Sequence, residues 1–416
     1  MNTELDVAVI GGGVIGAALA YGMADGHRRI AIFDEGDRAF RASRGNFGLV
    51  WVQGKGVDLP GYATWTRLSA SLWPELANMI RSDTGIDVAL DQPGGLHLCL
   101  SEDEADQRKA MVARHGHASA PPARIGEHAP PGIAAHETLP PCSVEMLEHA
   151  DVARLIPGLG SDVVAASFCD RDGHVNPLKL LRGLHAGFVT RGGRYFSPAG
   201  VSTIEHQAGG FVLESEAGRF AAAHVVIAAG LGTQALAAQV GIRAPLRAQR
   251  GHIIALRRMQ SVLRYPVDTL RQTDEATLLI GDSQDEVGID DSIALGTLGV
   301  MAERAVRMLP ALHAAIVQRT WAALRILTPD GFPLYESSRT HPGAFAVSSH
   351  SGITLAAVHA LRLGPQLATG SIDPNLRLFS SERFGIAPRG PTSAGVAARA
   401  QSRAAPIASG PSARRS

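Results

Sequence analysis

The chain of 416 residues is long enough for two domains with a sizeable core. Its 39 basic and 39 acidic residues give a formal net charge of +0, which argues against a nucleic-acid partner. The three cysteines are odd in number, spread along the chain and free of any CxxC pair. We therefore expect reduced thiols in a cytoplasmic protein, with no metal site or iron–sulfur cluster of its own. We expect neither a signal peptide nor a membrane span, and docking at a membrane through other subunits stays open.

A βαβ unit is predicted at the start of the chain. Residues 6–10, DVAVI, form a short apolar run bounded by glycine, as in a buried parallel strand. A glycine-rich turn follows at 11–16, and the apolar spacing over 14–25 predicts a helix. A second strand at 29–33 ends at Asp34, which completes the unit.

Strand and helix patterns then alternate in the middle and at the end of the chain, with strand-rich stretches between them. The further helices are predicted at 59–84, 102–115, 151–156, 177–190, 230–240, 299–309 and 353–367. The further strands are predicted at 87–100 (two strands), 163–169, 194–215 (a hairpin turning at 209–210), 224–228, 247–256, 264–270, 276–280, 316–326 and 344–348.

This order predicts an α/β fold, in which a Rossmann-type dinucleotide-binding domain carries an inserted, discontinuous antiparallel-sheet (α+β) substrate domain. After Glu382 no acidic residue occurs, and Ala, Ser, Pro, Gly and Arg dominate, which predicts a disordered tail. The predicted boundaries are 1–80, 175–245 and 325–380 for the dinucleotide-binding domain, 81–174 and 246–324 for the substrate domain, and 385–416 for the tail.

The glycine-rich turn has the pattern of a pyrophosphate site. Gly11 permits a tight turn, Gly13 lets a pyrophosphate approach the backbone, and Gly16 lets helix and strand pack closely. The helix N-terminus supplies N–H donors. Asp34 is placed to accept a hydrogen bond from a ribose hydroxyl, and an acid there disfavours NADP. The motif alone does not separate FAD from NAD, and an ordinary βα turn with loose glycines is the simpler alternative.

Six separated segments carry a family resemblance. They are DVAVIGGGVIGAALA at the start, SRGNFG at 43–48, DGHVNP at 172–177, HVVIAAG at 224–230, LRILTPDGFPL at 324–334 and SSHSGITLA at 348–356. In this order they resemble the FAD-dependent oxidoreductases of the D-amino-acid oxidase, glycine oxidase and sarcosine oxidase type. The last segment departs from the GH…NG motif that is usual in this family. The resemblance implies FAD. It implies a non-covalent link, because neither the 43–48 loop nor the late TPDGFP segment holds the His or Cys of covalent relatives.

The resemblance also implies which residues bind the flavin. Arg44 offers a guanidinium with several donors, and Ser43 offers a hydroxyl donor beside it. The alternative is that Arg44 is a solvated loop residue. The segment Gly352-Ile353-Thr354 is implied to aim N–H groups at the flavin N1–C2=O side, with simple helix capping as the alternative. The other predicted cofactor-binding residues are Gly11, Gly13, Val14, Ile15, Gly16, Asp34, Glu35, Gly45, Asn46, Gly48, Leu49, Val201, Ala229, Gly230 and Ser351.

Arg325 is the principal candidate for substrate binding. In relatives that oxidise glycine-like substrates, the arginine at this point holds the substrate carboxylate, which a guanidinium matches bidentately. A structural salt bridge at the domain junction is the alternative. Tyr265 and His252 on predicted strands, and His350 beside the flavin-facing loop, are further catalytic candidates, each with a purely structural alternative.

The resemblance implies oxidation at the C–N bond of a small amino acid, imino acid or N-substituted amino acid, by hydride transfer to flavin N5 and hydrolysis of the imine. SRGNFGLVWVQGKG (43–56) and QPGGLHL (92–98) are most similar to the flavin-carrying β subunits of opine and D-hydroxyproline dehydrogenases. That subgroup works beside iron–sulfur or other electron-transfer subunits.

A dehydrogenase is therefore favoured over an oxidase. Oxygen-using relatives often place a lysine over the flavin, and none of Lys55, Lys109 and Lys179 falls in a segment that we can align with that place. Four alternatives stay open: an oxygen-using amino-acid oxidase, a non-catalytic FAD-binding subunit, a flavoprotein acting on tRNA or another large substrate, and an NAD dehydrogenase.

Overall fold

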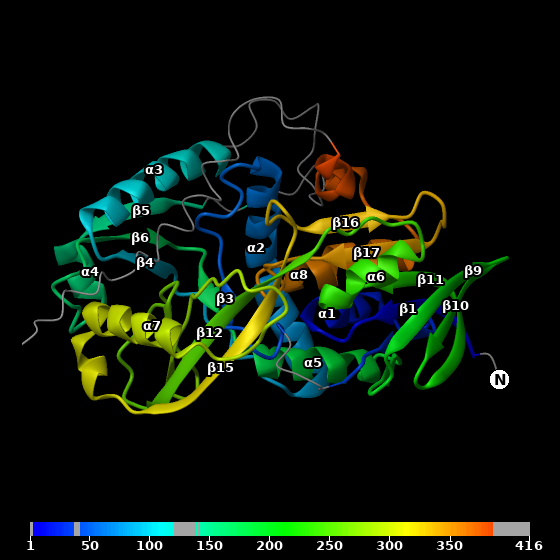
Figure 1. The fold of residues 1–416 in the computed structure, drawn as a ribbon, viewed down its shortest axis with the longest axis horizontal. Helices are drawn as coiled ribbons and strands as arrows, with labels where there is room; N and C mark the ends of the chain where they lie inside the picture. Colours follow the sequence, from blue (N-terminus) through cyan, green and yellow to red (C-terminus); the bar gives the residue numbers. More distant parts are fainter. Residues whose placement is uncertain (1–2, 37–41, 120–138, 140–141, 386–416) are drawn as a thin grey trace, which may run out of the picture. The chain divides into compact units, whose positions relative to one another are not determined.

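Parallel strands form the centre of an eight-stranded sheet in the computed structural model, which describes residues 3–36, 42–119, 139 and 142–385 (Figure 1). The strands follow the order β16-β17-β11-β1-β2-β8, and the hairpin β9–β10 extends the sheet from β11. The predicted tail lies outside the described residues except for Gly385. The strands are β1 (Thr3–Ile10), β2 (Ile30–Phe33), β8 (Arg194–Phe196), β9 (Val201–Gln207), β10 (Gly210–Ser215), β11 (Gly218–Ile227), β16 (Leu334–Ser337) and β17 (Ala344–Ser348).

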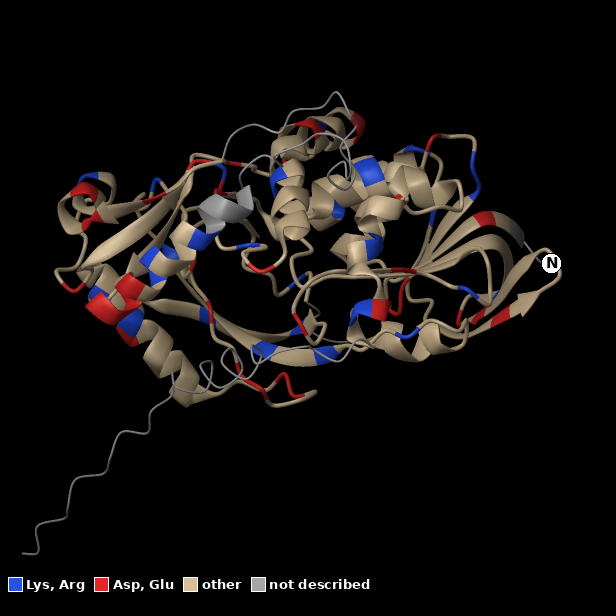
Figure 2. Cartoon of the chain, turned by 90° about the horizontal axis from the view of Figure 1, so that it is seen from above, with Lys and Arg blue, Asp and Glu red and all other residues tan. Residues whose placement is uncertain are grey.

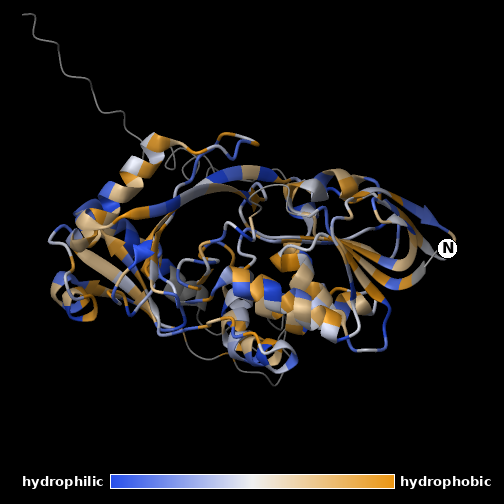
Figure 3. Cartoon of the chain, turned by 90° about the horizontal axis from the view of Figure 1, so that it is seen from below, coloured by the Kyte–Doolittle hydropathy of each residue, from blue (hydrophilic) through white to orange (hydrophobic). Residues whose placement is uncertain are grey.

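The first strand, β1, lies in the middle of this sheet, with β11 and β2 parallel to it on its two sides. Val7 and Val9 belong to one buried apolar cluster, and Ala8 and Ile10 belong to another. Both faces of the strand are therefore covered at this point, which explains why residues 7–10 form an uninterrupted apolar run rather than an alternating pattern. Figure 3 shows apolar residues concentrated along the strands of this sheet.

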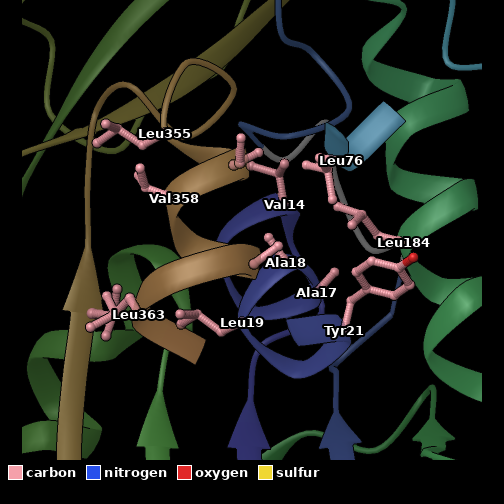
Figure 4. Close-up of a cluster of buried hydrophobic side chains, with 14 of the residues drawn as sticks. Val14, Ala17, Ala18, Leu19, Tyr21, Leu76, Leu184, Leu355, Val358 and Leu363 are labelled. Carbon is pink, nitrogen blue, oxygen red and sulfur yellow. The ribbon is translucent and has the colours of Figure 1, made fainter. Parts of the chain in front are cut away.

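Helix α1 (Val14–Met23) is the centre of the larger apolar cluster. Figure 4 shows its side chains beside Leu76 of α2 (Pro60–Thr84) and Leu184 of α5 (Pro177–Thr190). On another side they meet Leu355, Val358 and Leu363 of the helical segment that follows β17. This packing holds the N-terminus of α1 in a fixed place at the end of β1. The helical segment at the end comprises α8 (Ala356–Val358), a π-helical turn (His359–Leu363) and α9 (Gly364–Ala368).

Gly22 on α1 allows this close packing. A Cβ atom at Gly22 would lie 1.8 Å from the carbonyl oxygen of Ala360, a backbone atom that cannot swing away. We expect Gly22→Ala to lower the free energy of unfolding by about 3 kcal/mol, because the two helical segments must separate. Urea unfolding followed by circular dichroism measures it. Gly296→Ala, at a helical site with no atom within 4 Å of the new Cβ, is the control and should be stabilising by roughly 0.5–1 kcal/mol; equal midpoints for both variants would contradict the packing argument.

Two antiparallel sheets complete the described fold. In the four-stranded sheet the order is β13-β14-β12-β15, and in the three-stranded sheet it is β4-β6-β5. Figure 1 shows β12 and β15 as two long strands side by side, and their antiparallel register places Gln249 opposite Arg325. The strands are β4 (Gly95–Cys99), β5 (Val144–Glu148), β6 (Ala165–Cys169), β12 (Arg247–Arg258), β13 (Leu270–Gln272), β14 (Thr277–Ile280) and β15 (Val317–Leu327), with a separate pair β3 (Leu49–Val50) and β7 (Gly173–His174).

The remaining helices connect these sheets. They are α3 (Glu102–Ser119), α4 (His149–Leu155), α6 (Thr233–Ala238) and α7 (Leu295–Met308), with 3-10 turns at Gly230–Gly232, Pro310–Ala314, Pro374–Phe379 and Ser381–Phe384. Positive and negative residues are interspersed along the chain (Figure 2). Within the described residues, no helix combines the length and the apolar character needed to cross a membrane.

The structure differs from the sequence-based prediction in several elements: β3, β5, β7 and β16 were not predicted, and β8, at the start of the predicted hairpin, pairs with β2. Only one strand forms within 87–100, because Ala89 has a φ of 54°, in the left-handed region that interrupts an extended strand. The strand predicted at 264–270 begins only at Leu270, since Pro266 has no N–H to donate to a ladder. The helix predicted at 353–367 starts at Ala356 and contains a π turn, directly before Pro365, which lacks the N–H of a regular α-helix.

The predicted fold class is confirmed: parallel strands and helices build one part, and antiparallel sheets the other. The large sheet draws its strands from 3–33, 194–227 and 334–348, and the antiparallel sheets from 95–169 and 247–327. By its contacts, Met1–Ser381 forms one compact unit. The predicted domain boundaries therefore stay a prediction.

Candidate active site

One large cavity opens at the carboxyl ends of the parallel strands. Its volume is about 930 Å³, near the upper end of the roughly 300–1,000 Å³ typical of ligand pockets. Ile10 at the end of β1, Phe33 at the end of β2 and Ser348 at the end of β17 line it. Further lining residues come from β12 and β15 of the antiparallel sheet. This is the edge at which open α/β sheets bind their ligands.

The turn between β1 and α1 presents backbone N–H groups to this cavity. Gly11 has a φ of 104°, and a Cβ atom on it would lie 2.4 Å from the carbonyl oxygen of Ala228. Gly13 is the N-cap of α1 and offers no side-chain cap, and the first turn holds no acidic residue. The amide of Val14 donates to Ser43 Oγ at 2.9 Å. The positive end of the helix dipole therefore faces the cavity with no acidic residue in the first turn of the helix.

Asp34 lies beside this turn at the end of β2. Its Oδ2 accepts a hydrogen bond from the Gly12 amide at 2.6 Å, and its Oδ1 accepts one from the Gly36 amide at 2.9 Å. Glu35 and Val201 line the cavity next to it. The carboxylate is thus held at the cavity wall by two backbone donors, in a position to accept a hydroxyl as well.

Two segments about 300 residues apart meet on another side of the cavity. Thr354 Oγ1 accepts a hydrogen bond from the Trp51 amide at 3.1 Å. The carbonyl oxygen of Thr354 accepts hydrogen bonds from Ser69 Oγ at 2.6 Å and Trp73 Nε1 at 3.1 Å, both on α2. A Cβ atom at Gly352 would lie 2.9 Å from Val14 Cγ1, so this loop passes close to the start of α1. The loop at 351–354 is thereby fixed against α2 and the start of α1.

Arg325 reaches the same cavity from β15. Its guanidinium lies over Gly251 of β12, where a Cβ atom would be 2.6 Å from Arg325 Cζ, and its Nη1 donates to the carbonyl oxygen of Ser283. Burial lowers the pKa of Arg325, and the nearby Asp282 and Asp285 partly oppose this. Within the described residues, Arg325 forms no ion pair. A partly buried guanidinium with free donors is a ready site for a carboxylate.

The family follows from comparison with known proteins. The family model described as FAD dependent oxidoreductase matches residues 6–364. The chain belongs to this family. It is 38% identical over 384 residues to a subunit of the opine oxidase of Rhizobium meliloti, and the match covers 92% of this chain and 98% of that protein. It is 28% identical over 381 residues to the glycine oxidase of Geobacillus kaustophilus, covering 87% and 92%. The crystal structure of glycine oxidase from Geobacillus kaustophilus matches with a TM-score of 0.77 at 25% identity, covering 91% of this chain and 98% of that one.

The residues at the cavity fit FAD, the cofactor of this family. The N-terminus of α1, whose N-cap residue Gly13 has no side chain, suits a pyrophosphate, and a Cβ atom on Gly13 would meet only Ser43 Oγ, at 3.0 Å. Asp34 suits a ribose hydroxyl. We expect these residues, together with the loop at 351–354, to hold the cofactor.

Nearly all the residues predicted from the sequence line this cavity. Gly16, Gly48 and Tyr265 do not. A Cβ atom on Gly16 would lie 2.0 Å from the Gly11 carbonyl oxygen, and one on Gly48 would lie 2.5 Å from that of Val175, so both glycines serve close packing behind the wall. The predicted residues that line the cavity are Gly11, Gly13, Val14, Ile15, Asp34, Glu35, Ser43, Arg44, Gly45, Asn46, Leu49, Val201, Ala229, Gly230, His252, Arg325, His350, Ser351, Gly352, Ile353 and Thr354.

Tyr265 packs away from the cavity. Its ring meets Phe168 edge to face, with 5.7 Å between the centroids, and joins the apolar cluster of the antiparallel sheets. The structure therefore does not bring Tyr265 to the place that a catalytic role requires. The strand expected to aim it at the flavin is interrupted at Pro266.

The two predicted histidines reach the cavity as neutral rings. His252 accepts a hydrogen bond at Nε2 from the Ala294 amide (3.0 Å), so its proton is on Nδ1, which donates to Ser283 Oγ (2.9 Å). Burial lowers the pKa of His252. Burial, with the charges of Lys55 and Arg325, lowers the pKa of His350 well below its usual range. His252 is fully engaged in structural hydrogen bonds, whereas His350 faces two cations.

Lys55 is a cavity residue that the sequence reasoning missed. Its Nζ donates to Ser351 Oγ at 2.9 Å, and Tyr62 Oη lies 2.9 Å from the same oxygen. The placement of the lysines therefore no longer favours a dehydrogenase. The signal was present, because Lys55 lies inside the 43–56 segment that carries part of the family resemblance.

A histidine–aspartate pair also lines the cavity. His97 Nδ1 on β4 lies 2.7 Å from Asp268 Oδ2, and the Asp268 amide donates to the Leu96 carbonyl oxygen. Burial would raise the pKa of Asp268, but His97, followed by Arg108 and Arg304, more than offsets this and lowers it. Asp268 Oδ1 is buried without a hydrogen-bond partner among the described residues. No local pattern could reveal this pair, whose members are 171 positions apart in the chain.

Two of the cysteines are close in space although they are separated in the sequence. Cys142 and Cys169 have their Sγ atoms 3.7 Å apart as free thiols, outside the cavity lining, and Asp170 is near both. Their separation of 27 positions along the chain gives no sign of this proximity. β5 and β6 bring them together, since Cys142 comes just before β5 and Cys169 ends β6.

Proposed function

We propose that the chain oxidises the C–N bond of a small amino acid, imino acid or N-substituted amino acid of the opine or D-hydroxyproline type. The observation that carries the proposal is Arg325, a partly buried cation that lines the cavity without a carboxylate partner among the described residues. Because Gly251 has no side chain, it leaves room for the planar guanidinium of Arg325, whose edge can then meet a carboxylate. The 38% identity to an opine oxidase subunit supports the same substrate class.

The reaction removes a hydride from the carbon and a proton from the nitrogen, and the resulting imine adds water and splits into a carbonyl compound and ammonia or an amine. FAD, when bound, accepts the hydride. The chain's own residues orient the substrate and adjust its protonation. Arg325 holds the carboxylate, and the positive charges of Arg325 and Lys55 disfavour the ammonium form of the amine, so the substrate nitrogen keeps the lone pair that the reaction needs.

We further propose that the chain is a dehydrogenase subunit that delivers electrons to a partner rather than to oxygen. The support is the name of the relative from Rhizobium meliloti, which is a subunit of a larger enzyme and aligns over 98% of its length. The partner would carry an iron–sulfur cluster or another electron carrier. An oxygen-using oxidase, as the similarity to glycine oxidase suggests, is the second candidate.

Anaerobic dye reduction tests the proposal. The FAD-loaded protein is mixed with an artificial acceptor and a panel of D-amino acids, D-hydroxyproline, sarcosine, glycine and opines, and oxygen uptake is followed in parallel. We expect dye reduction with at least one of these amines and little oxygen uptake. Fast oxygen uptake would establish the oxidase. A flavin that stays oxidised with every amine would overturn the catalytic proposal and favour a non-catalytic FAD-binding subunit.

A further inference from the structure

Lys55 brings a second positive charge into the cavity that holds Arg325. It follows β3, lines the cavity, and donates from Nζ to Ser351 Oγ. Within the described residues, Lys55 forms no ion pair. Lys55 is thus the second cation in the cavity that has no carboxylate partner in the described chain.

Burial is the largest electrostatic cost to the charged form of Lys55. Burial lowers the pKa of Lys55 most, Asp172 and Asp282 act in the opposite direction, Arg325 adds a smaller lowering, and the resulting pKa is about 8. Burial raises the pKa of Asp172 to about 7, so this carboxyl is only partly ionised near neutrality. Two neighbouring interior cations repel one another and lose hydration. A ligand that brings two negative charges would relieve both costs.

We propose that Lys55 binds a second carboxylate of the substrate, and that the substrate is a secondary amine carrying a carboxylate on each of its two arms. This rests on the proposed function, in which Arg325 holds the first carboxylate. Ser351, with Tyr62 behind it, keeps the ammonium group of Lys55 at the cavity wall. A substrate with one carboxylate uses Arg325 alone, so Lys55 separates N-carboxyalkyl amino acids from N-alkyl and primary amino acids.

The first test measures binding with inert ligands, so it does not depend on catalysis. Thiodiacetate carries two carboxymethyl arms on a central sulfur, and (methylthio)acetate, here called methylthioacetate, has a methyl group in place of one of these arms. We expect the wild-type FAD-loaded protein to bind thiodiacetate more tightly in calorimetry. Lys55→Met should lower the affinity for thiodiacetate about 30-fold and the affinity for methylthioacetate less than about threefold.

Matched variants sharpen this test. Lys109→Met removes an exposed lysine of α3 that pairs with Asp106 outside the cavity, and should change neither affinity. Lys55→Arg should keep the preference for thiodiacetate, because a guanidinium also binds carboxylates. Equal losses for both ligands in Lys55→Met would mean that Lys55 serves the fold or the flavin, and an absence of any thiodiacetate preference in the wild type would also overturn the proposal.

The pH dependence provides a second readout. Lys55 is protonated below its pKa of about 8 and loses its charge above it. The groups that face it are Asp172, Asp282, Arg325 and His350, with Tyr62 one hydroxyl away. Thiodiacetate affinity should therefore fall as the pH rises through about 8 in the wild type, and stay level in Lys55→Arg. A parallel fall in both proteins would contradict the role of Lys55.

Failure of this proposal differs from failure of the proposed function. If no amine reduces the dye but thiodiacetate binds through Lys55, the dicarboxylate site stands and the oxidation does not. If sarcosine and iminodiacetate are oxidised equally fast and Lys55→Met slows both alike, the proposed oxidation stands. The proposed second carboxylate site is then rejected.

Discussion

Arg325→Lys is expected to raise KM for amino-acid substrates by about 30- to 100-fold while FAD content stays at the wild-type level. Lysine keeps the charge but presents a single ammonium point, so it cannot meet both carboxylate oxygens as the planar fork does. The backbone carbonyl of Ser283 and the space above Gly251 are shaped for the guanidinium, and a lysine at this site leaves part of that space empty. Anaerobic dye-reduction kinetics and the flavin absorbance of the purified variant measure both quantities.

The same strand offers the control for this variant. Arg319 is an exposed residue of β15 whose guanidinium stacks on Trp321 outside the cavity lining, so Arg319→Lys should leave KM unchanged. If Arg325→Lys left KM unchanged for every acidic substrate, Arg325 would be a structural residue of the antiparallel sheet. If it lost FAD together with activity, its role would lie with the cofactor.

The cofactor end of the cavity could be predicted because its pattern is local. The turn from Gly11 to Gly16 and the acid at Asp34 belong to one contiguous βαβ unit, and Gly11 and Gly16 have the steric reasons expected of them. Gly16 packs the helix against the turn, and Gly13 leaves an open space beside the helix N-terminus. Such a unit specifies its own geometry, so the sequence alone is sufficient.

The substrate end could be predicted only in part, because its residues meet through tertiary packing. Arg325 was found by resemblance, whereas His97 and Asp268 come together only when β4 docks beside the chain that precedes β13. Lys55 lies in an irregular segment, where no periodicity says which way a side chain points. Tyr265 shows the converse: a residue expected on a strand turns away when the strand does not form.

Gly13→Val is expected to lower FAD affinity at least about 100-fold, equivalent to roughly 3 kcal/mol, without unfolding the protein. The new Cβ atom meets only the Ser43 hydroxyl within the chain, at 3.0 Å, and no backbone atom, so we expect the fold to accept the substitution. It occupies the space beside the helix N-terminus where a pyrophosphate must approach. The FAD-to-protein ratio after purification and the far-ultraviolet circular dichroism spectrum separate loss of cofactor from loss of fold.

The choice of Gly13 over its neighbours makes the test specific. Gly11→Val would combine a φ of 104° with a clash at the Ala228 carbonyl oxygen, and Gly16→Val would place its Cβ atom 2.0 Å from the Gly11 carbonyl oxygen, so both would disrupt the fold itself. Gly299→Val, on α7 with no atom within 4 Å of its Cβ, is the matched control and should retain FAD. A Gly13→Val protein that purifies fully loaded with FAD would show that the pyrophosphate does not bind at the N-terminus of α1. The proposed orientation of the cofactor toward Arg325 would then also be wrong.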